Sequence, residues 1–426
     1  MNGLRHRPGR LVAALLAVVA LLVGAACSSG DDGGSGDAAA TTTTEVAGPT
    51  STTETDTGLE PEEVGSAEEL YAVPDPVPDV DHGTLLRYQE ITPSPTDGAA
   101  TYRVMYTSES LAGDPIVVTG TVVLPTGPAP EEGRTTLALA HGTTGIADEC
   151  APSRAEGGRE LALAGPAAER GWITTSTDYE GLGTPGRHPY LVGESEGRSV
   201  VDSVLAAGML PGADQGDRLA IAGYSQGGHG ALWAGEVAPD WAPDMEVVGT
   251  FAGAPATEVD VILQAAPRLP QAGFAYMIVA GIAAAYPEAE PDQILTPEGV
   301  SRLDAVDEGC AREIFAAVAG VPASDLVRPD GPSTEPWPEL ARAQNPGQVV
   351  TEAPILIVHS AQDETVPVAL SGILYGRMCE EGQVVERRVL PEGSHVGAAP
   401  EAYRQGLAWL FDLAEGGSPT DGCPAA

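Results

Sequence analysis

Short apolar strand-like segments alternate with helix-like segments from about residue 100 onward, and this alternation constrains the fold more than any other feature of the chain. Two β-branched stretches come first, 102–107 and 116–124, and predict an antiparallel pair. The strands expected after them are 135–140, 172–177, 218–223, 246–251, 354–359 and 384–389, and the expected helices are 157–169, 196–209, 226–237, 367–378 and 399–414. Alternation of this kind predicts an α/β fold with a mostly parallel central sheet and helices on both faces.

A serine stands at one of the predicted junctions between strand and helix. The segment Gly223-Tyr224-Ser225-Gln226-Gly227 matches G-x-S-x-G, directly after an apolar strand and before a helix. On such a sharp turn the serine is strained and exposed, and the flanking glycines remove side chains that would collide with neighbouring backbone. Ser225 is therefore the candidate nucleophile.

A serine hydroxyl needs a general base, and the base needs an orienting carboxylate. On this kind of sheet the order along the chain is Ser, then Asp or Glu, then His. His395 lies in a predicted loop between the last strand and the terminal helix, and is the expected base. Asp363 directly follows the strand 354–359 and is the expected acid, with Glu364 as the alternative. His359, at the end of that strand, is interpreted as a packed structural residue.

Two backbone amides are needed to stabilise the oxyanion of such a reaction. The amide of Gln226, immediately after the nucleophile, is one candidate. The loop that follows the strand 135–140 supplies the other, with Thr143 preferred and Thr144 as the alternative. His141 in the same loop is expected to be structural.

The composition excludes several other chemistries. The formal net charge is −40 and the chain contains no lysine. P-loop, kinase and Schiff-base sites all require lysine, and a nucleic-acid partner requires basic patches. The segment 181–186 matches G-x-G-x-x-G, but it contains Pro185 and no helix opens after it, so a turn is the better interpretation. No zinc or EF-hand spacing occurs, so neither a cofactor nor a metal is expected.

The first residues have the pattern of an export signal. Three arginines precede an apolar run over 11–26, and the ending Val-Gly-Ala-Ala-Cys resembles the lipobox of bacterial lipoproteins. We therefore expect a signal peptide at 1–26 and lipid modification of Cys27; an ordinary secretory signal with a leftover cysteine is the alternative.

Residues 27–66 are rich in Thr, Gly, Ser and acidic residues and predict a disordered tether, which is followed by one domain over 67–426. The expected location is extracytoplasmic, either anchored to the cell membrane through that lipid or secreted, and a monomer is expected.

Four further cysteines remain, Cys150, Cys310, Cys379 and Cys423. An even number in an exported chain predicts two disulfides, for which three connectivities exist.

A helical cap is expected at about 256–345, because only one strand of the sheet pattern falls between Ser225 and Asp363. The apolar stretch 272–286 is too short to span a bilayer and predicts a helix buried in this cap; a lid helix lining an acyl tunnel is the alternative.

Several motifs together resemble the secretory lipase family, typified by fungal lipases of the Candida lipase A kind and by related actinobacterial exported proteins. They are His141-Gly142-Thr143-Thr144-Gly145, Cys150-Ala151-Pro152-Ser153, Asp178-Tyr179-Glu180-Gly181-Leu182-Gly183, His188-Pro189-Tyr190-Leu191, 223–228, Ala231-Leu232-Trp233-Ala234-Gly235 and Gly253-Ala254-Pro255. The resemblance covers about 85–415. It implies an α/β-hydrolase core, an inserted lid and carboxylic-ester hydrolysis. It also implies the pairing that we prefer, Cys150 with Cys310 and Cys379 with Cys423.

The predicted function is thus a serine hydrolase, an esterase or lipase that cleaves small-molecule or lipid esters through an acyl-enzyme. The alternative is an acyltransferase or a prolyl-type peptidase that uses the same three residues. A binding lipoprotein without catalytic activity is the hypothesis from outside the enzyme class.

Overall fold

The structure is a computed structural model that describes residues 59–155, 159–269 and 272–424. The predicted signal peptide, Cys27 and most of the predicted tether lie outside the described residues. The structure differs from the prediction at the end of the tether. There Glu62–Glu63 forms the short strand β1, and Ser66 caps the helix α2 (Ala67–Leu70) by accepting from the Glu69 amide.

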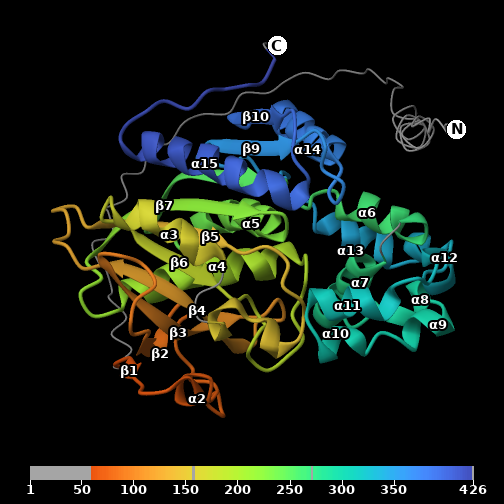
Figure 1. Ribbon diagram of the computed structural model, residues 1–426, viewed down its shortest axis with the longest axis horizontal. Helices are drawn as coiled ribbons and strands as arrows, with labels where there is room; N and C mark the ends of the chain where they lie inside the picture. Colours follow the sequence, from red (N-terminus) through yellow and green to blue (C-terminus); the bar gives the residue numbers. More distant parts are fainter. Residues whose placement is uncertain (1–58, 156–158, 270–271, 425–426) are drawn as a thin grey trace, which may run out of the picture. The chain divides into compact units, whose positions relative to one another are not determined.

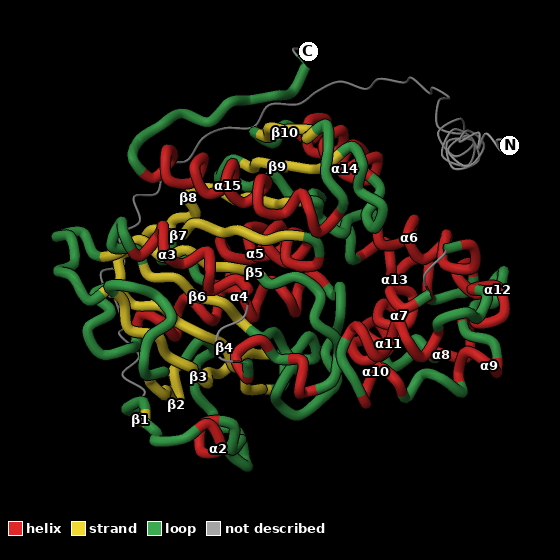
Figure 2. The backbone as a smooth tube through the Cα atoms, viewed as in Figure 1, coloured by secondary structure: helices red, strands yellow, loops and turns green. Residues whose placement is uncertain are grey.

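A single sheet runs through the described domain, with the strand order β1-β2-β3-β4-β6-β5-β7-β8-β9-β10 (Figures 1 and 2). Strands β2, β3, β4 and β6 pair antiparallel, and all pairs from β6 through β5 to β10 are parallel. The strands after β1 are Leu85–Glu90, Ala99–Glu109, Pro115–Pro125, Arg134–Ala140, Ile173–Thr177, Gln215–Tyr224, Glu246–Gly253, Ile355–Ser360 and Val385–Leu390. The predicted fold class is confirmed.

Every strand expected from the sequence is present, but β2 was missed. Its sequence Leu-Leu-Arg-Tyr-Gln-Glu contains no β-branched residue and no strict alternation, so local propensity does not identify it as a strand. Its conformation comes from the ladder with β3, in which Tyr88 lies opposite Val104. The segment 181–186 forms a turn with no helix after it, as expected.

Helices cover both faces of the sheet, and the alternation of side chains along β7 shows why. Ala220 and Ala222 pack with α3 (Ala164–Ala168) and α15 (His395–Ala414), whereas Leu219 and Ile221 pack with α4 (Gly193–Gly208) and α5 (Gln226–Trp241). The helix α14 (Val368–Glu381) packs on β9 and β10. Parallel strands covered on both faces have apolar residues in both directions, as observed here.

Between β8 and β9 the chain forms a helical insertion with a core of its own (Figure 1). Its helices α6 to α13 are Val259–Ala265, Gly273–Ala285, Pro291–Ile294, Pro297–Val300, Ala305–Glu308, Ala311–Val318, Ala323–Leu326 and Trp337–Ala343. The apolar stretch singled out in the sequence forms α7, which is buried around most of its circumference. Among the described residues, no helix is both long and apolar enough to cross a membrane.

Two disulfides join Cys150 to Cys310 and Cys379 to Cys423, with Cα–Cα distances of 5.4 and 5.5 Å. This is the pairing that the family resemblance implies. The first disulfide links the loop after β5 to the helical insertion, and the second links α14 to the C-terminal segment.

Candidate active site

Ser225 occupies the turn between β7 and α5, and its backbone conformation is strained. Its φ is +62°, which L-residues seldom adopt, and its N–H donates to the Gly253 carbonyl at 2.9 Å. The flanking glycines are required by close backbone approach. A Cβ on Gly223 would lie 1.9 Å from the Gly227 carbonyl oxygen, and one on Gly227 would lie 2.0 Å from that of Ala140. The packing therefore explains both glycines of the motif.

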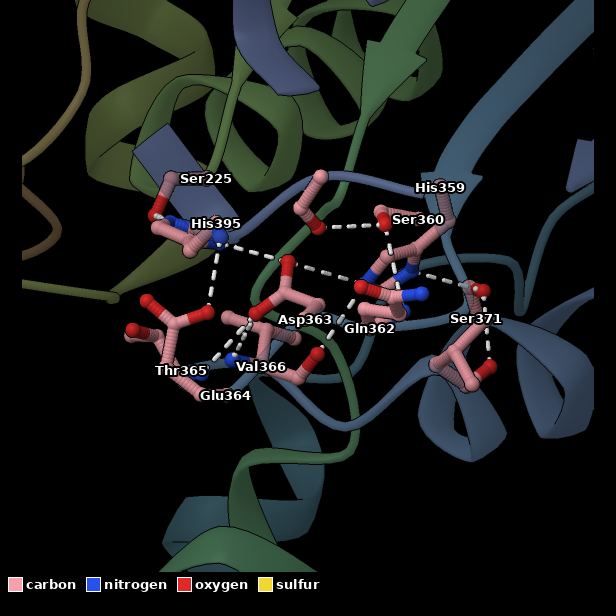
Figure 3. Close-up of polar contacts among 12 residues, drawn as sticks. Ser225, His359, Ser360, Gln362, Asp363, Glu364, Thr365, Val366, Ser371 and His395 are labelled. Carbon is pink, nitrogen blue, oxygen red and sulfur yellow. Dashed lines mark hydrogen bonds and ion pairs between the residues drawn. The ribbon is translucent and has the colours of Figure 1, made fainter. Parts of the chain in front are cut away.

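The three residues predicted as nucleophile, base and acid lie together in space (Figure 3). His395 Nε2 is 2.9 Å from Ser225 Oγ, and His395 Nδ1 is 2.6 Å from Asp363 Oδ2. A carboxylate only accepts, so Nδ1 carries the hydrogen and Nε2 is left to accept from the serine hydroxyl. The geometry is that of a serine activated for attack.

The prediction that His395 lies in a loop is wrong, because it is the first residue of α15. Ser394 caps this helix by accepting from the Gly397 amide at 3.1 Å, so the helix begins four residues earlier than predicted. The Tyr224 hydroxyl donates to the His395 carbonyl at 2.6 Å. His395 is thus held by the first turn of a helix and by Tyr224, the residue before Ser225.

The Asp363 side chain is fully buried and all its hydrogen-bond partners are donors. Oδ1 accepts from the amides of Thr365 and Val366 at 2.9 and 2.8 Å, and Oδ2 faces His395. Burial opposes ionisation, but the hydrogen bonds from His359 and His395 outweigh it and lower the pKa of the carboxyl well below its usual range. The alternative acid, Glu364, is exposed and accepts from the His395 backbone N–H at 2.9 Å instead of from its imidazole.

His359 contributes to the site in a way that the sequence interpretation missed. It is buried as expected, but its Nε2 lies 3.3 Å from Asp363 Oδ2 and 3.0 Å from the Val366 carbonyl oxygen. Both neighbours accept, so this nitrogen carries a hydrogen, while Nδ1 faces Ser371 Oγ at 2.8 Å. In the sequence, the only indication of this contact was the position of His359 at the end of a predicted strand, four residues before Asp363.

The loop after β5, which was expected to supply an oxyanion amide, lies against the serine turn. A Cβ on Gly142 would be 3.3 Å from the Tyr224 carbonyl oxygen. His141 is fully buried, with its ring nitrogens next to the carbonyl oxygens of Gly142 and Asp178, which agrees with a structural role. The backbone N–H groups of Thr143, Thr144 and Gln226 donate to no backbone carbonyl among the described residues.

The Gln226 side chain is used for packing rather than chemistry. It is buried, and its Nε2 lies 2.9 Å from both Glu196 Oε1 and His188 Nε2. Burial lowers the pKa of His188 to about 4, so its ring is neutral and accepts at Nε2 while Nδ1 donates to the Glu180 carbonyl. The Nε2 donor of Gln226 is therefore engaged, and the backbone amide is the donor of this residue that can face a reacting group.

A serine on a strained strand-to-helix turn, a carboxylate after a later strand and a histidine after the last strand define an α/β-hydrolase. The family model of secretory lipases matches residues 156–422, more than half of the chain, so the chain belongs to the secretory lipase family.

Individual relatives agree with this assignment. The chain is 25% identical to a secreted triacylglycerol lipase of Malassezia globosa over 384 residues, which is 83% of this chain and 82% of the relative. A probable inactive lipase of Mycobacterium tuberculosis is 24% identical over 363 residues, covering 80% of each chain. The structure of Candida antarctica lipase A in its closed state superimposes with a TM-score of 0.70 at 22% identity, covering 83% of this chain and 87% of that one. Since one of these relatives is described as inactive, activity must be argued from the site itself.

Proposed function

We propose that this protein hydrolyses carboxylic esters through Ser225, His395 and Asp363. Family membership supports a hydrolase of the lipase and esterase class. The observation that carries the proposal is the hydrogen-bonded series Ser225, His395, Asp363, whose two links measure 2.9 and 2.6 Å. All three residues follow the carboxyl ends of parallel strands, where ligands bind in such sheets.

In the first half-reaction, His395 Nε2 takes the Ser225 proton while Oγ attacks the ester carbonyl carbon. Asp363 stabilises the imidazolium that forms. The oxyanion is held by the backbone amides of Gln226 and of Thr143, with Thr144 as the alternative. His395 then donates the proton to the leaving alcohol, which leaves an acyl group on Ser225.

In the second half-reaction, His395 takes a proton from water, and the hydroxide equivalent attacks the acyl carbonyl. The same amides hold the second oxyanion, and the proton returns to Ser225 as the acid is released. An acyltransferase would replace water by an alcohol, and a prolyl-type peptidase would cleave an amide. Product analysis with alcohol acceptors and amide substrates distinguishes these alternatives.

The proposal is tested by labelling with a fluorophosphonate, which reacts only with activated serines. We expect stoichiometric labelling, mapped by mass spectrometry to the peptide containing Ser225, together with release of acid from an ester. A folded protein that neither labels nor hydrolyses esters would support the binding lipoprotein instead.

We expect long-chain esters to be preferred. The Malassezia globosa relative is a triacylglycerol lipase, and triacylglycerols are esters with apolar acyl chains. Apolar burial favours each added methylene of a bound acyl chain by about 0.8 kcal/mol. Hydrolysis measured from acetyl to long-chain acyl esters should therefore rise with chain length and above the solubility limit of the substrate. A preference for acetyl and butyryl esters alone would contradict the lipase assignment and leave an esterase.

We further propose that the mature chain is extracytoplasmic and anchored through a lipid on Cys27. Two acyl chains on one residue give stable membrane attachment. A Cys27→Ser variant is expected to move from the membrane fraction to the soluble fraction without loss of specific activity. Equal membrane association of both forms would contradict the anchor and support the ordinary secretory signal.

A further inference from the structure

The loop that carries the second oxyanion amide is held by the helical insertion. The Ala311 amide, at the start of α11, donates to the Thr144 carbonyl at 2.8 Å, and Gly145 forms an isolated antiparallel bridge with Cys310. The disulfide between Cys150 and Cys310 closes the same contact covalently. A distant segment of the insertion is thus fixed to the loop beside Ser225.

The two residues after Thr144 pack closely against the helical insertion. Gly145 has a φ of +143°, and a Cβ there would lie 2.7 Å from both the Cys310 Cα and the Cys150 Sγ. The next residue, Ile146, is 2% exposed and belongs to the apolar core of the insertion rather than to that of the sheet. The loop therefore packs into the insertion as one of its parts.

Thr143 is held from the insertion as well, through Tyr190. The Thr143 hydroxyl is 2.8 Å from the Tyr190 hydroxyl. Tyr190 is buried in the core of the insertion, and a Cβ on Gly281 of α7 would lie 2.4 Å from its backbone N and O. The positions of both candidate donors, Thr143 and Thr144, consequently depend on contacts with the helical insertion and its apolar core.

We infer that the Cys150–Cys310 disulfide and the Ala311 amide are positioning elements for the oxyanion loop, and that the insertion contributes to the rate of ester hydrolysis through them. This inference rests on the proposed function. Oxyanion stabilisation depends on donors preorganised at hydrogen-bond distance, so loosening the loop weakens it. Substrate binding elsewhere in the site is unaffected, and the loss is therefore expected in kcat rather than in KM.

The second disulfide provides a matched control. Cys379 and Cys423 lie against the apolar cluster between α14 and the sheet, and Cys423 Sγ contacts the Gln383 carbonyl. No predicted site residue is part of that cluster. Its loop of 44 residues and the 160-residue loop of the first disulfide both restrict the unfolded chain, so removal of either disulfide lowers stability.

The experiment compares Cys150→Ala/Cys310→Ala with Cys379→Ala/Cys423→Ala, each assayed well below its own melting temperature on a soluble ester. We expect kcat to fall by about tenfold to a thousandfold in the first double variant, with KM little changed, and to stay within about twofold in the second. Amide hydrogen exchange over 141–147 should accelerate only in the first. Equal kcat losses in both, or unchanged kcat and exchange in the first, would overturn the inference.

A second variant covers the case in which the first double variant does not fold. Ala311→Pro keeps the disulfide but removes the amide that donates to Thr144, and its ring crowds the Thr144 oxygen. Ala311 is the first residue of α11 and Cys310 before it is extended, so the helix and the preceding residue tolerate proline. We expect a loss of kcat of about tenfold or more; wild-type turnover would overturn the inference. If the wild type itself hydrolyses no ester, the proposed function fails, while the hydrogen-exchange comparison still tests the support of the loop.

Discussion

Ser225→Ala is expected to lower the turnover of ester hydrolysis by on the order of a million-fold while the protein remains folded. The hydroxyl is the only atom of this residue that reaches His395, and its removal leaves the base with no proton to take. Alanine is smaller than serine and keeps the same backbone, so the strained turn at φ +62° is no harder to form. Residual hydrolysis would come from the oxyanion amides and from substrate binding alone.

The measurement is kcat on a chromogenic ester, with fluorophosphonate titration of each sample to exclude wild-type contamination. Ser203→Ala is the matched control. Ser203 is buried in α4, where its hydroxyl lies 3.0 Å from Thr175 Oγ1 and 2.7 Å from the Val200 carbonyl. It is expected to lose stability of about 1 kcal/mol but to keep turnover. Undiminished hydrolysis by Ser225→Ala would end the case for this nucleophile.

The proximity of Ser225, Asp363 and His395 could be predicted from the sequence, because the topology of a parallel sheet places them together. Each follows a predicted strand, and parallel strands place their carboxyl ends at one edge of the sheet. The order of β7, β8, β9 and β10 side by side then fixes the neighbours. The strand pattern and the glycine motif were nearly enough to predict the candidate site, because both can be read from short segments of the sequence.

What the sequence did not predict depends on contacts between distant segments. His359 Nε2 lies 3.3 Å from Asp363 Oδ2 because the loop after β9 folds back on the strand. The hydrophobic pattern of the sequence does not indicate such a turn. The support of Thr144 by Ala311 joins positions far apart in the chain. Strand β2 forms through its partner β3 despite weak propensity. In each case, tertiary packing decided what local preference left open.

Asp363→Asn is expected to lower kcat by about ten-thousand-fold. The Asn side chain can donate from Nδ2 to His395 Nδ1, which moves the imidazole hydrogen to Nε2. That nitrogen then faces Ser225 Oγ as a donor and cannot take its proton. The neutral amide also fails to stabilise the imidazolium. The expected result is a folded enzyme with the wrong tautomer of its base.

The pH dependence follows from the lowered pKa of Asp363 in the wild type. Because that pKa lies below the value in the unfolded chain, about 3.9, the ionised carboxylate stabilises the fold above about pH 4, and this contribution is lost as the pH falls towards the folded pKa. Asp363 therefore stays ionised over the working range. The acid limb of kcat/KM should accordingly contain no second protonation from Asp363, which would be measured as a slope steeper than one in the logarithmic pH profile.

Glu364→Gln is the control that separates the two neighbouring carboxylates. Glu364 accepts from the His395 backbone N–H, and the amide oxygen of Gln can still accept there, so we expect kcat within about fivefold of the wild type. Both variants are compared by kcat/KM across the pH range and by thermal unfolding at neutral pH. Turnover kept by Asp363→Asn but abolished by Glu364→Gln would transfer the role of the acid to Glu364. A large loss in Asp363→Asn alone would establish that the buried carboxylate, held by Thr365, Val366 and His359, orients the base.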